Sequence, residues 1–436
     1  MIGRLHPTPS VLAIAARFEK AGFEAWCVGG AIRDALLGGD PLDWDLATPA
    51  TPEQVRELFG KRRTIPKGIE FGTVSVLDDE GIEHEITTFR HDVRTDGRHA
   101  EVEFGVSLND DLARRDFTIN AIAYSPRRNE VRDPFDGRGD LARKLVRAVG
   151  DADARMREDR LRALRAIRFA ARFGFTIDPP TYAAIEASAP FLRRLSPERV
   201  KQELDKTLEQ VRCPSSAFMI WQSTGAFGAL VPALGQVTPD ALRVCDYLAL
   251  PGPATRPARR AIRFAGLLLS LGAKAAEDVL LSLRASRHET QAVATLIDRW
   301  QSHGPTIADA LVSGGSIANV DVRRWVAVIG RLQVGPFMRL ATAVWHAARN
   351  SGVSAPPAGA ARSLYRRMLR VAFHDPIDLA ALAVDGDDLR RAGVLPGPGL
   401  GKILQALLAA VLEDPDRNTT EWLLREAKRL HAQHAS

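Results

Sequence analysis

The alternation of apolar and polar residues predicts a mixed α/β structure for the first third of the chain. Apolar Leu12, Ile14, Ala15 and Phe18 build a helical pattern into the first 25 residues. Short runs of strand-like residues follow at 26–28, 72–78 and 82–89. The acidic turn at 78–81 indicates that the last two runs form a hairpin.

From about residue 140 onward the strand pattern disappears, and helical segments are separated by prolines. Stretches rich in Pro, Gly and Arg at 251–261 and 355–363 are typical of linkers or long loops. We therefore predict an α+β head followed by an all-helical neck, body and tail. The expected boundaries are 1–139 for the head, 140–212 for the neck, 213–325 for the body and 326–436 for the tail.

Composition adds a cellular context and a class of partner. With 45% apolar and 26% charged residues among 436, the chain is typical of a soluble protein of several domains. No apolar stretch could span a bilayer and no signal-peptide pattern is present, so we expect a cytoplasmic protein. Three widely spaced cysteines argue against disulfides or structural zinc. Residues 140–212 carry 16 Lys and Arg against 11 Asp and Glu, which points to a polyanionic partner.

Two aspartates one residue apart are the most informative feature of the head. Asp43 and Asp45 stand in an apolar run at 42–46, where the alternation of a strand would place both carboxylates on one face. Such carboxylates repel each other unless a divalent cation lies between them, and hard oxygen ligands suit Mg²⁺ that also holds a triphosphate. In isolation, the same pair is also typical of a solvated strand face.

Residues near this pair add a phosphate site and further carboxylates. Gly29 and Gly30 form a turn that opens a helix with Arg33 in its first turn, and helix N-termini bind phosphates. Glu83 and Glu85 share one face of the second hairpin strand. Either glutamate could approach the aspartates if the strands are neighbours.

Residues 114–124 carry a second candidate set ahead of an apolar helical run. Arg114 and Arg115 match phosphate oxygens, which arginine binds bidentately. Asp116 and Asn120 could bond ribose hydroxyls. An ordinary capped helix fits this pattern equally well.

Residues 158–169 carry a third set. At about 100° per residue, this segment has one charged and one apolar face. The charged face holds Glu158, Asp159, Arg162 and Arg165, and the apolar face holds Leu161, Leu164 and Ile167. Asp159 and Arg162 could present an acceptor beside a donor, with Glu158 holding Arg162. The alternative is a plain salt-bridged helix face.

Together these segments resemble the class II tRNA nucleotidyltransferase and bacterial poly(A) polymerase family, within the polymerase-β-like nucleotidyltransferase superfamily. The matching elements occur in family order over about residues 25–210. They are Gly29-Gly30 with Arg33-Asp34, Asp43-x-Asp45, Arg114-Arg115-Asp116-Phe117-Thr118-x-Asn120-Ala121, Asp133-Pro134-x-Asp136-Gly137-x-x-Asp140-Leu141, Glu158-Asp159-x-x-Arg162-x-x-Arg165 and Ser196-x-Glu198-Arg199-x-x-x-Glu203.

The resemblance implies a polymerase-β-like head and a role for each matching residue. Asp43 and Asp45 would bind Mg²⁺ and activate an RNA 3′-hydroxyl for two-metal in-line attack on an α-phosphate, with Glu85 as the candidate third carboxylate. The residues implied to bind triphosphate are Gly29, Gly30, Arg33, Arg115, Arg165 and Arg168. Asp116 and Asn120 would contact the ribose. Asp159 and Arg162, oriented by Glu158, would read the Watson–Crick edge of the incoming base.

Within this family the sequence favours addition of C, C and A to tRNA lacking its 3′-CCA end, from CTP and ATP. Residues 64–74 resemble the CCA-adding version, although Phe71 replaces the usual His. Residues 90–104 supply a loop that C-only enzymes typically lack. The alternative is a poly(A) polymerase or an A-only enzyme acting on RNA 3′ ends.

Two further functions are disfavoured. A catalytically dead RNA-binding module would lack a metal carboxylate or the triphosphate arginine, and both are present. His91-Asp92 and His374-Asp375 lack the surrounding ligands of a phosphohydrolase. We expect no membrane association and no obligate protein partner, while body and tail would bind tRNA.

Overall fold

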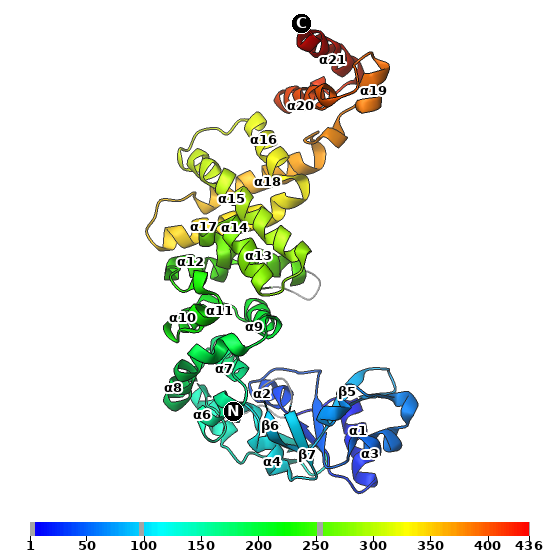
Figure 1. Cartoon of the computed structure of the whole chain (residues 1–436), viewed down its shortest axis with the longest axis vertical. Coiled ribbons are helices and arrows are strands. Elements are labelled where there is room, and N and C mark those ends of the chain that lie inside the picture. The colour runs from blue at the N-terminus through cyan, green and yellow to red at the C-terminus, as the bar shows by residue number, and fades with distance from the viewer. Residues whose placement is uncertain (1–4, 96–99, 251–255, 436) are drawn as a thin grey trace. The chain divides into compact units, whose positions relative to one another are not determined.

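The computed structural model describes residues 5–95, 100–250 and 256–435 (Figure 1). The chain divides into two compact units. The first unit comprises Met1–Thr207 with Ser216–Gly235, and the second comprises Leu208–Ser215 with Gln236–Ser436. The finer division into head, neck, body and tail stays a prediction.

A seven-stranded mixed sheet forms the centre of the head, which confirms the predicted α+β class. Its strands, in spatial order, are β3 (Thr64–Ile65), β4 (Thr73–Leu77), β5 (Glu83–Thr88), β2 (Asp45–Thr48), β1 (Trp26–Val28), β8 (Ala123–Ser125) and β9 (Glu130–Arg132). The β2–β5 pair is parallel and the other pairs are antiparallel.

The hairpin of β4 and β5 confirms the sequence prediction. Asp78 closes its turn, because Oδ1 accepts hydrogen bonds from the backbone N–H groups of Glu80 and Ile82 at 2.9 and 2.8 Å. Along β5 the alternation is clear: His84, Ile86 and Thr88 are buried, whereas Glu85 is exposed. One face of the sheet is therefore packed and the other is open.

Two helices pack together beside the sheet (Figure 1). α1 (Pro9–Lys20) is the predicted N-terminal helix, and the hydroxyl of Thr8 caps it by accepting from the Val11 N–H. α3 (Pro52–Phe59) brings the Phe59 ring to 5.2 Å from that of Phe18 in α1. Both rings are buried, so this contact closes the packed side of the head.

The remaining helices of the first unit follow the sheet or connect its strands. They are α2 (Gly30–Leu36), α4 (Leu108–Ala113), α5 (Gly137–Arg143), α6 (Ala152–Glu158), α7 (Leu161–Phe173), α8 (Pro179–Ser188), α9 (Pro197–Gln210), α10 (Ser215–Ser223) and α11 (Ala226–Leu230). α9 crosses from the first unit into the second at Thr207.

Three local predictions are corrected. Residues 90–95 and 100–104 form paired strands rather than an open loop, with β6 (Arg90–Thr95) antiparallel to β7 (Ala100–Phe104) and Glu103 opposite His91; residues 96–99 of the predicted loop lie outside the described residues. Strands also do not vanish after residue 140, because β10 (Leu145–Val146) pairs with β11 (Thr176–Ile177). The predicted continuous helix through 158–169 is broken at Asp159, whose φ of −145° and ψ of 105° are extended.

The described residues of the second unit form helices joined by turns and loops, with no strand, as predicted. Its helices are α12 (Pro239–Arg243), α13 (Arg256–Leu268), α14 (Ala273–Ser282), α15 (Arg287–Val312), α16 (Asn319–Ile329), α17 (Val334–Asn350), α18 (Ala358–His374), α19 (Gly386–Arg391), α20 (Pro398–Glu413) and α21 (Thr420–Ala435). The last three share a core that includes Leu389, Leu407 and Leu423 (Figure 1). Across the described ranges, no helix is both long enough and apolar enough to cross a bilayer.

A buried arginine anchors the end of α9 within the second unit. The Arg263 guanidinium donates to the carbonyl oxygens of Leu208 and Val211 at 2.6 and 2.8 Å, and to that of Leu248 at 2.9 Å. Carbonyls in the last turn of a helix lack intrahelical partners. Arg263 therefore satisfies groups that burial would otherwise leave unpaired.

Candidate active site

A cavity of about 550 Å³ opens on the exposed side of the sheet and is lined only by residues of the first unit. It brings together most of the predicted site residues. Those on its wall are Gly29, Gly30, Arg33, Asp45, Glu85, Arg115, Asp116, Asn120, Asp159, Arg162 and Arg165. Asp43, Glu158 and Arg168 are not on the wall.

Two carboxylates, Asp45 and Glu85, lie at one end of this cavity, and the charge of a third, Asp43, acts on Asp45 from outside the wall. Asp45 is the first residue of β2, and the pairing of Leu46 with Ile86 sets Glu85 of β5 beside it. Burial, and then the negative charges of Glu85 and Asp43, raise the pKa of Asp45 to about 7, while Arg115 opposes the rise. Asp43 is exposed and precedes the strand, so the pair straddles the start of β2 instead of lying within it.

This donor set fits a hard divalent cation. A carboxyl whose charge is disfavoured by neighbouring carboxylates gains most from a cation placed among them. Among the described residues, no three His, Cys, Asp or Glu side chains are grouped closely enough to enclose an ion. The arrangement therefore resembles Mg²⁺ sites in which one or two carboxylates act together with substrate phosphates and water.

The glycine turn lies directly beside these carboxylates. Gly29 has a φ of 78°, and a Cβ there would approach Arg115 Nη1 to 3.3 Å and Asp45 Oδ2 to 3.9 Å. Arg115 is held by Asp111 at 3.1 Å, and its buried Nε has no hydrogen-bond partner among the described groups. The lack of a side chain at Gly29 thus keeps space open between a carboxylate and a guanidinium.

Arg33 joins the head to α7. Its Nη1 donates to Asn120 Oδ1 at 2.6 Å, and Nε donates to Asp34 Oδ1 at 2.8 Å. The guanidinium carbon lies 5.0 and 4.8 Å from the ring centroids of Phe169 and Phe173. Arg33 borders the cavity but is only 4% exposed, so much of its hydrogen-bonding capacity is used within the protein.

Asp116 links the cavity wall to α7 in the same way. Arg165 donates to Asp116 Oδ2 through Nε at 2.8 Å and lies 2.7 Å from it through Nη2, while Asn120 Nδ2 donates to Oδ1 at 2.9 Å. Although burial raises the pKa of Asp116, Arg165 and Asn120 lower it further, so the carboxyl has a pKa below its ordinary value. Asp116 is thus ionised, and its hydrogen bond with Asn120 holds the implied ribose-binding pair in a fixed arrangement.

The structure corrects the prediction for Arg168. Its guanidinium is buried and faces Glu203 of α9, with 2.6 Å between Nε and Oε2. Both side chains are nearly inaccessible. Arg168 therefore does not reach the cavity and supports the packing of α7 instead.

The predicted base-reading residues are held by ion pairs. Arg162 Nη1 donates to Glu158 Oε2 at 2.7 Å, which confirms the predicted contact, and its Nη2 donates to the Arg114 carbonyl at 3.0 Å. Asp159 Oδ1 accepts from the Leu161 N–H at 3.0 Å, and Oδ2 accepts from Arg199 at 2.7 Å. Acceptor and donor both reach the cavity wall.

The motif at 133–141 lies outside the cavity and has a structural role. Asp140 is fully buried and accepts from the Thr118 hydroxyl at 2.6 Å and from Arg147 Nε at 2.8 Å. A Cβ at Gly137 would lie 2.2 Å from the Thr118 carbonyl oxygen, so glycine is required there. These contacts fix the turn that carries Asn120.

Sequence reasoning gave no role to several residues that line the cavity. They are Val28, Thr73, Thr87, Arg90, Leu161, Phe169 and Arg199, whereas Arg114, which also lines the cavity, was a candidate phosphate ligand. Thr87 continues the exposed face of β5 and Thr73 is opposite it on β4, so strand alternation was the available signal.

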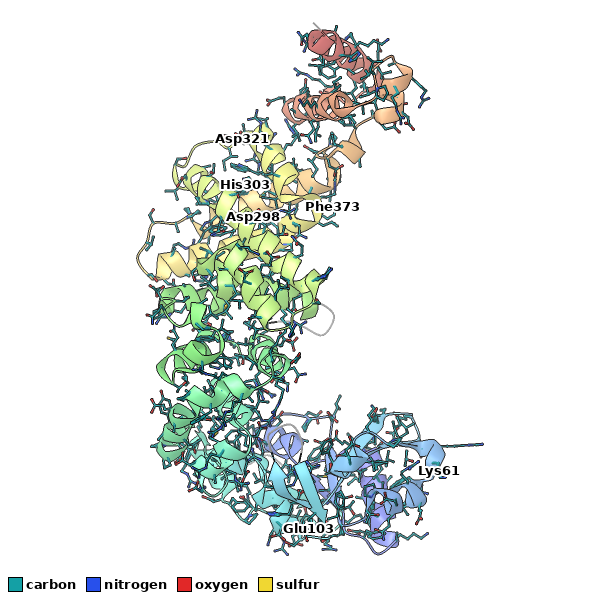
Figure 2. The ribbon with its side chains drawn as sticks, viewed as in Figure 1. Lys61, Glu103, Asp298, His303, Asp321 and Phe373 are labelled. Carbon is teal, nitrogen blue, oxygen red and sulfur yellow. The ribbon has the colours of Figure 1, made fainter. Side chains whose placement is uncertain are left out.

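In the second unit, Asp298 and His303 lie on α15, Asp321 lies on α16 (Figure 2) and His374 ends α18. The described residues there form no group able to hold a metal.

Comparison with known proteins identifies the family. A family model described as the poly A polymerase head domain matches residues 25–147. A second, described as the probable RNA and SrmB-binding site of polymerase A, matches 174–236. The CCA-adding enzyme of Limosilactobacillus fermentum is 33% identical, over 96% of this chain and 96% of its own. This chain belongs to the CCA-adding enzyme family.

Other CCA-adding enzymes are similar to this chain over most of its length. The CCA-adding enzyme of Levilactobacillus brevis is 35% identical, over 88% of this chain and 89% of its own. The structure of the Bacillus stearothermophilus CCA-adding enzyme in complex with CTP has a TM-score of 0.79 at 29% identity and covers 99% of both chains. The Thermotoga maritima enzyme, at 21% identity and a TM-score of 0.65, shares the fold.

Proposed function

We propose that this protein adds C, C and A to the 3′ end of tRNA that lacks them, from CTP and ATP, with release of diphosphate. The observation that carries the proposal is a single cavity with Asp45 and Glu85 at one end and the acceptor–donor pair of Asp159 and Arg162 on its wall. The first pair suits phosphoryl transfer, and the second suits selection of a base without a template. Membership of the CCA-adding enzyme family supports the choice of substrate.

The proposed reaction forms a bond from the RNA 3′-oxygen to the α-phosphorus and breaks the bond to the oxygen that bridges to the β-phosphate. Such a transfer depends on positioning and charge neutralisation, so no covalent nucleophile is needed. Arg115, next to the space kept open by Gly29, would bind the triphosphate. Asp43 and Asp45 would hold divalent metal, proposed to be two Mg²⁺ ions. Bound there, the metal would neutralise phosphate charge and lower the pKa of the attacking hydroxyl.

Base selection would follow from the polarity of the protein groups. Cytosine offers an amino group to the carboxylate of Asp159, and its N3 and O2 accept from Arg162. Adenine can use the same pair through its amino group and N1. Uracil and guanine present a carbonyl oxygen to the carboxylate, which costs about 1–3 kcal/mol for an unpaired buried acceptor.

Sequencing of product 3′ ends tests the proposal. Transcripts of tRNA ending before CCA, after the first C and after the second C are incubated with Mg²⁺ and CTP, ATP or both. We expect C-C from CTP alone on the shortest transcript, and C-C-A when both are present. The variant Asp45→Asn serves as the inactive control, and Asp79→Asn, whose side chain is 88% exposed, serves as the active control.

A poly(A) polymerase or A-only enzyme is the second candidate. The description of the matching head model as a poly A polymerase domain favours it. Runs of A on the shortest transcript with ATP alone, and no C incorporation, would support this candidate and refute CCA addition.

A further inference from the structure

The family motif at residues 196–203 carries no function implied by the sequence, although Arg199 lies on the cavity wall. It lies at the start of α9, where Arg199 and Glu203 are one helical turn apart. Arg199 contacts Asp159 and Glu203 contacts Arg168, at 2.7 and 2.6 Å. One face of α9 is thus attached to two points of the segment that carries the base-reading residues.

The attachment at Asp159 is the more consequential of the two. Asp159 lies in the break between α6 and α7, where its backbone is extended. Its side-chain direction is therefore set by its own contacts rather than by a helix. The carboxylate accepts from the Leu161 N–H at Oδ1 and from Arg199 at Oδ2, so loss of Arg199 removes the hydrogen bond that holds Oδ2.

We propose that Arg199 is a positioning residue for nucleotide selection, which it performs by orienting the Asp159 carboxylate. This inference rests on the proposed function. A carboxylate oxygen can accept two hydrogen bonds, so the bond from Arg199 leaves capacity on Oδ2 for the amino group of a base. Arg199 itself lines the cavity and its side chain is 25% exposed.

The two base-reading residues then have matching supports of opposite charge. Arg162 is paired with Glu158 and Asp159 is paired with Arg199, each at 2.7 Å. The four groups together carry no net charge, which suits a neutral base. An unpaired Asp159 would repel the triphosphate, and an unpaired Arg199 would attract phosphate to the place of the base.

The test measures kcat and KM for each of the four nucleoside triphosphates with the full-length protein. For Arg199→Ala we expect a loss of roughly 10- to 100-fold in kcat/KM for CTP and ATP, as for a misplaced substrate contact. The relative use of UTP and GTP should rise. Arg199→Lys keeps the charge but not the planar fork, so we expect partial recovery of selectivity. The exposed Arg193, on the preceding 3₁₀ turn, provides the matched control Arg193→Ala, which should behave as the parent.

A double-mutant cycle separates positioning from a general structural effect. If Arg199 acts through Asp159, Arg199→Ala should change nucleotide preference little when Asp159 is already Ala. Parental preference in Arg199→Ala, or an equal loss for all four nucleotides that adds to that of Asp159→Ala, would overturn the inference. Failure of the parent protein to add C or A would instead refute the proposed function. Thermal unfolding checks that each variant is folded. If Arg199→Ala does not fold, the same measurements are made with Arg199→Lys.

Discussion

Asp45 and Glu85 lie side by side because β2 and β5 run parallel, with Leu46 opposite Ile86. The charge of Glu85 adds to the effect of burial and raises the pKa of Asp45 to about 7. Two strands that are distant in sequence thus create a group that is poorly ionised without a cation and favourably ionised with one. This relationship makes the site testable without measuring the reaction.

The first prediction concerns stability and pH in the absence of metal. The folded pKa of Asp45 lies above its ordinary value of 3.8, so the folded state holds more protons than the unfolded state between about pH 4 and pH 7. Stability of the parent should therefore fall as pH rises through this window. Asp45→Asn cannot titrate at this position. Its free energy of unfolding minus that of the parent should therefore be up to about 4 kcal/mol larger at pH 8 than at pH 4.

Urea unfolding at pH 4 and pH 8 in EDTA measures this difference. Asp79→Asn, at an exposed position, is the control and should follow the parent at both pH values. Added Mg²⁺ at pH 8 should stabilise the parent more than Asp45→Asn. A gap between Asp45→Asn and the parent that does not change with pH would contradict the prediction.

The second prediction separates two glutamates on one strand. Glu85 lines the cavity. Glu83 lies outside the cavity wall and forms an ion pair with the exposed Lys67 at 2.6 Å. We expect Glu85→Gln to lower the rate of CTP incorporation by roughly 10²–10³-fold, because it removes charge where transition-state charge is stabilised. Glu83→Gln should retain the parental rate. Equal rates in both variants would remove Glu85 from the site.

Sequence periodicity predicted the elements in which one face is buried over several residues. α1 and the β4–β5 hairpin are of this kind, and the short run at 26–28 was predicted as well, although β1 is buried on both faces. It missed β10 and β11, because strands of two residues carry no periodicity. It also missed the break at Asp159, since the charge pattern of a helix continues through the extended residue.

Strand alternation was enough to predict where Glu85 lies, and Glu85 is on the cavity wall. Asp159 also lies on the wall, although the helix expected to carry it is broken there. The roles of both residues stay predictions. The predicted position of Arg168 at the triphosphate was wrong. A helical pattern shows which residues share a face, but it does not show whether that face meets a cavity or a buried partner such as Glu203 on a distant helix. Arg199 was given no role for the same reason, because its contact depends on how α9 packs.

The third prediction tests the structural role of Arg168. Glu203→Gln leaves Arg168 buried without its carboxylate, and loss of one partner of a buried ion pair costs about 3–5 kcal/mol. The double variant Arg168→Met, Glu203→Leu should recover most of this stability in urea unfolding. The folded double variant should keep the parental KM for CTP. A raised KM with normal stability would restore Arg168 to the triphosphate site.

The fourth prediction concerns tRNA affinity. Because the neck segment carries an excess of basic residues, we expect tRNA to be held mainly through its phosphates and shape. Each phosphate neutralised adds about 0.7–0.9 to the slope of log Kd against log salt. Filter binding between low and physiological ionic strength measures the slope. A Kd that does not change with salt would contradict the prediction.

The last prediction concerns template-free choice of nucleotide. Asp159→Ala and Arg162→Ala remove the acceptor and the donor, so each should lower use of CTP and ATP by roughly 5- to 150-fold, which corresponds to about 1–3 kcal/mol. Relative misuse of UTP or GTP should increase, because no acceptor then opposes their carbonyl oxygens. The exposed neighbours on α6 give matched controls, Asp153→Ala and Arg157→Ala, which should retain the parental preference. Competition between the four nucleotides, followed by sequencing of the 3′ ends, measures the preference. If both variants kept the parental choice of CTP and ATP, the two residues would be a salt-bridged helix end, and base selection would reside elsewhere in the cavity.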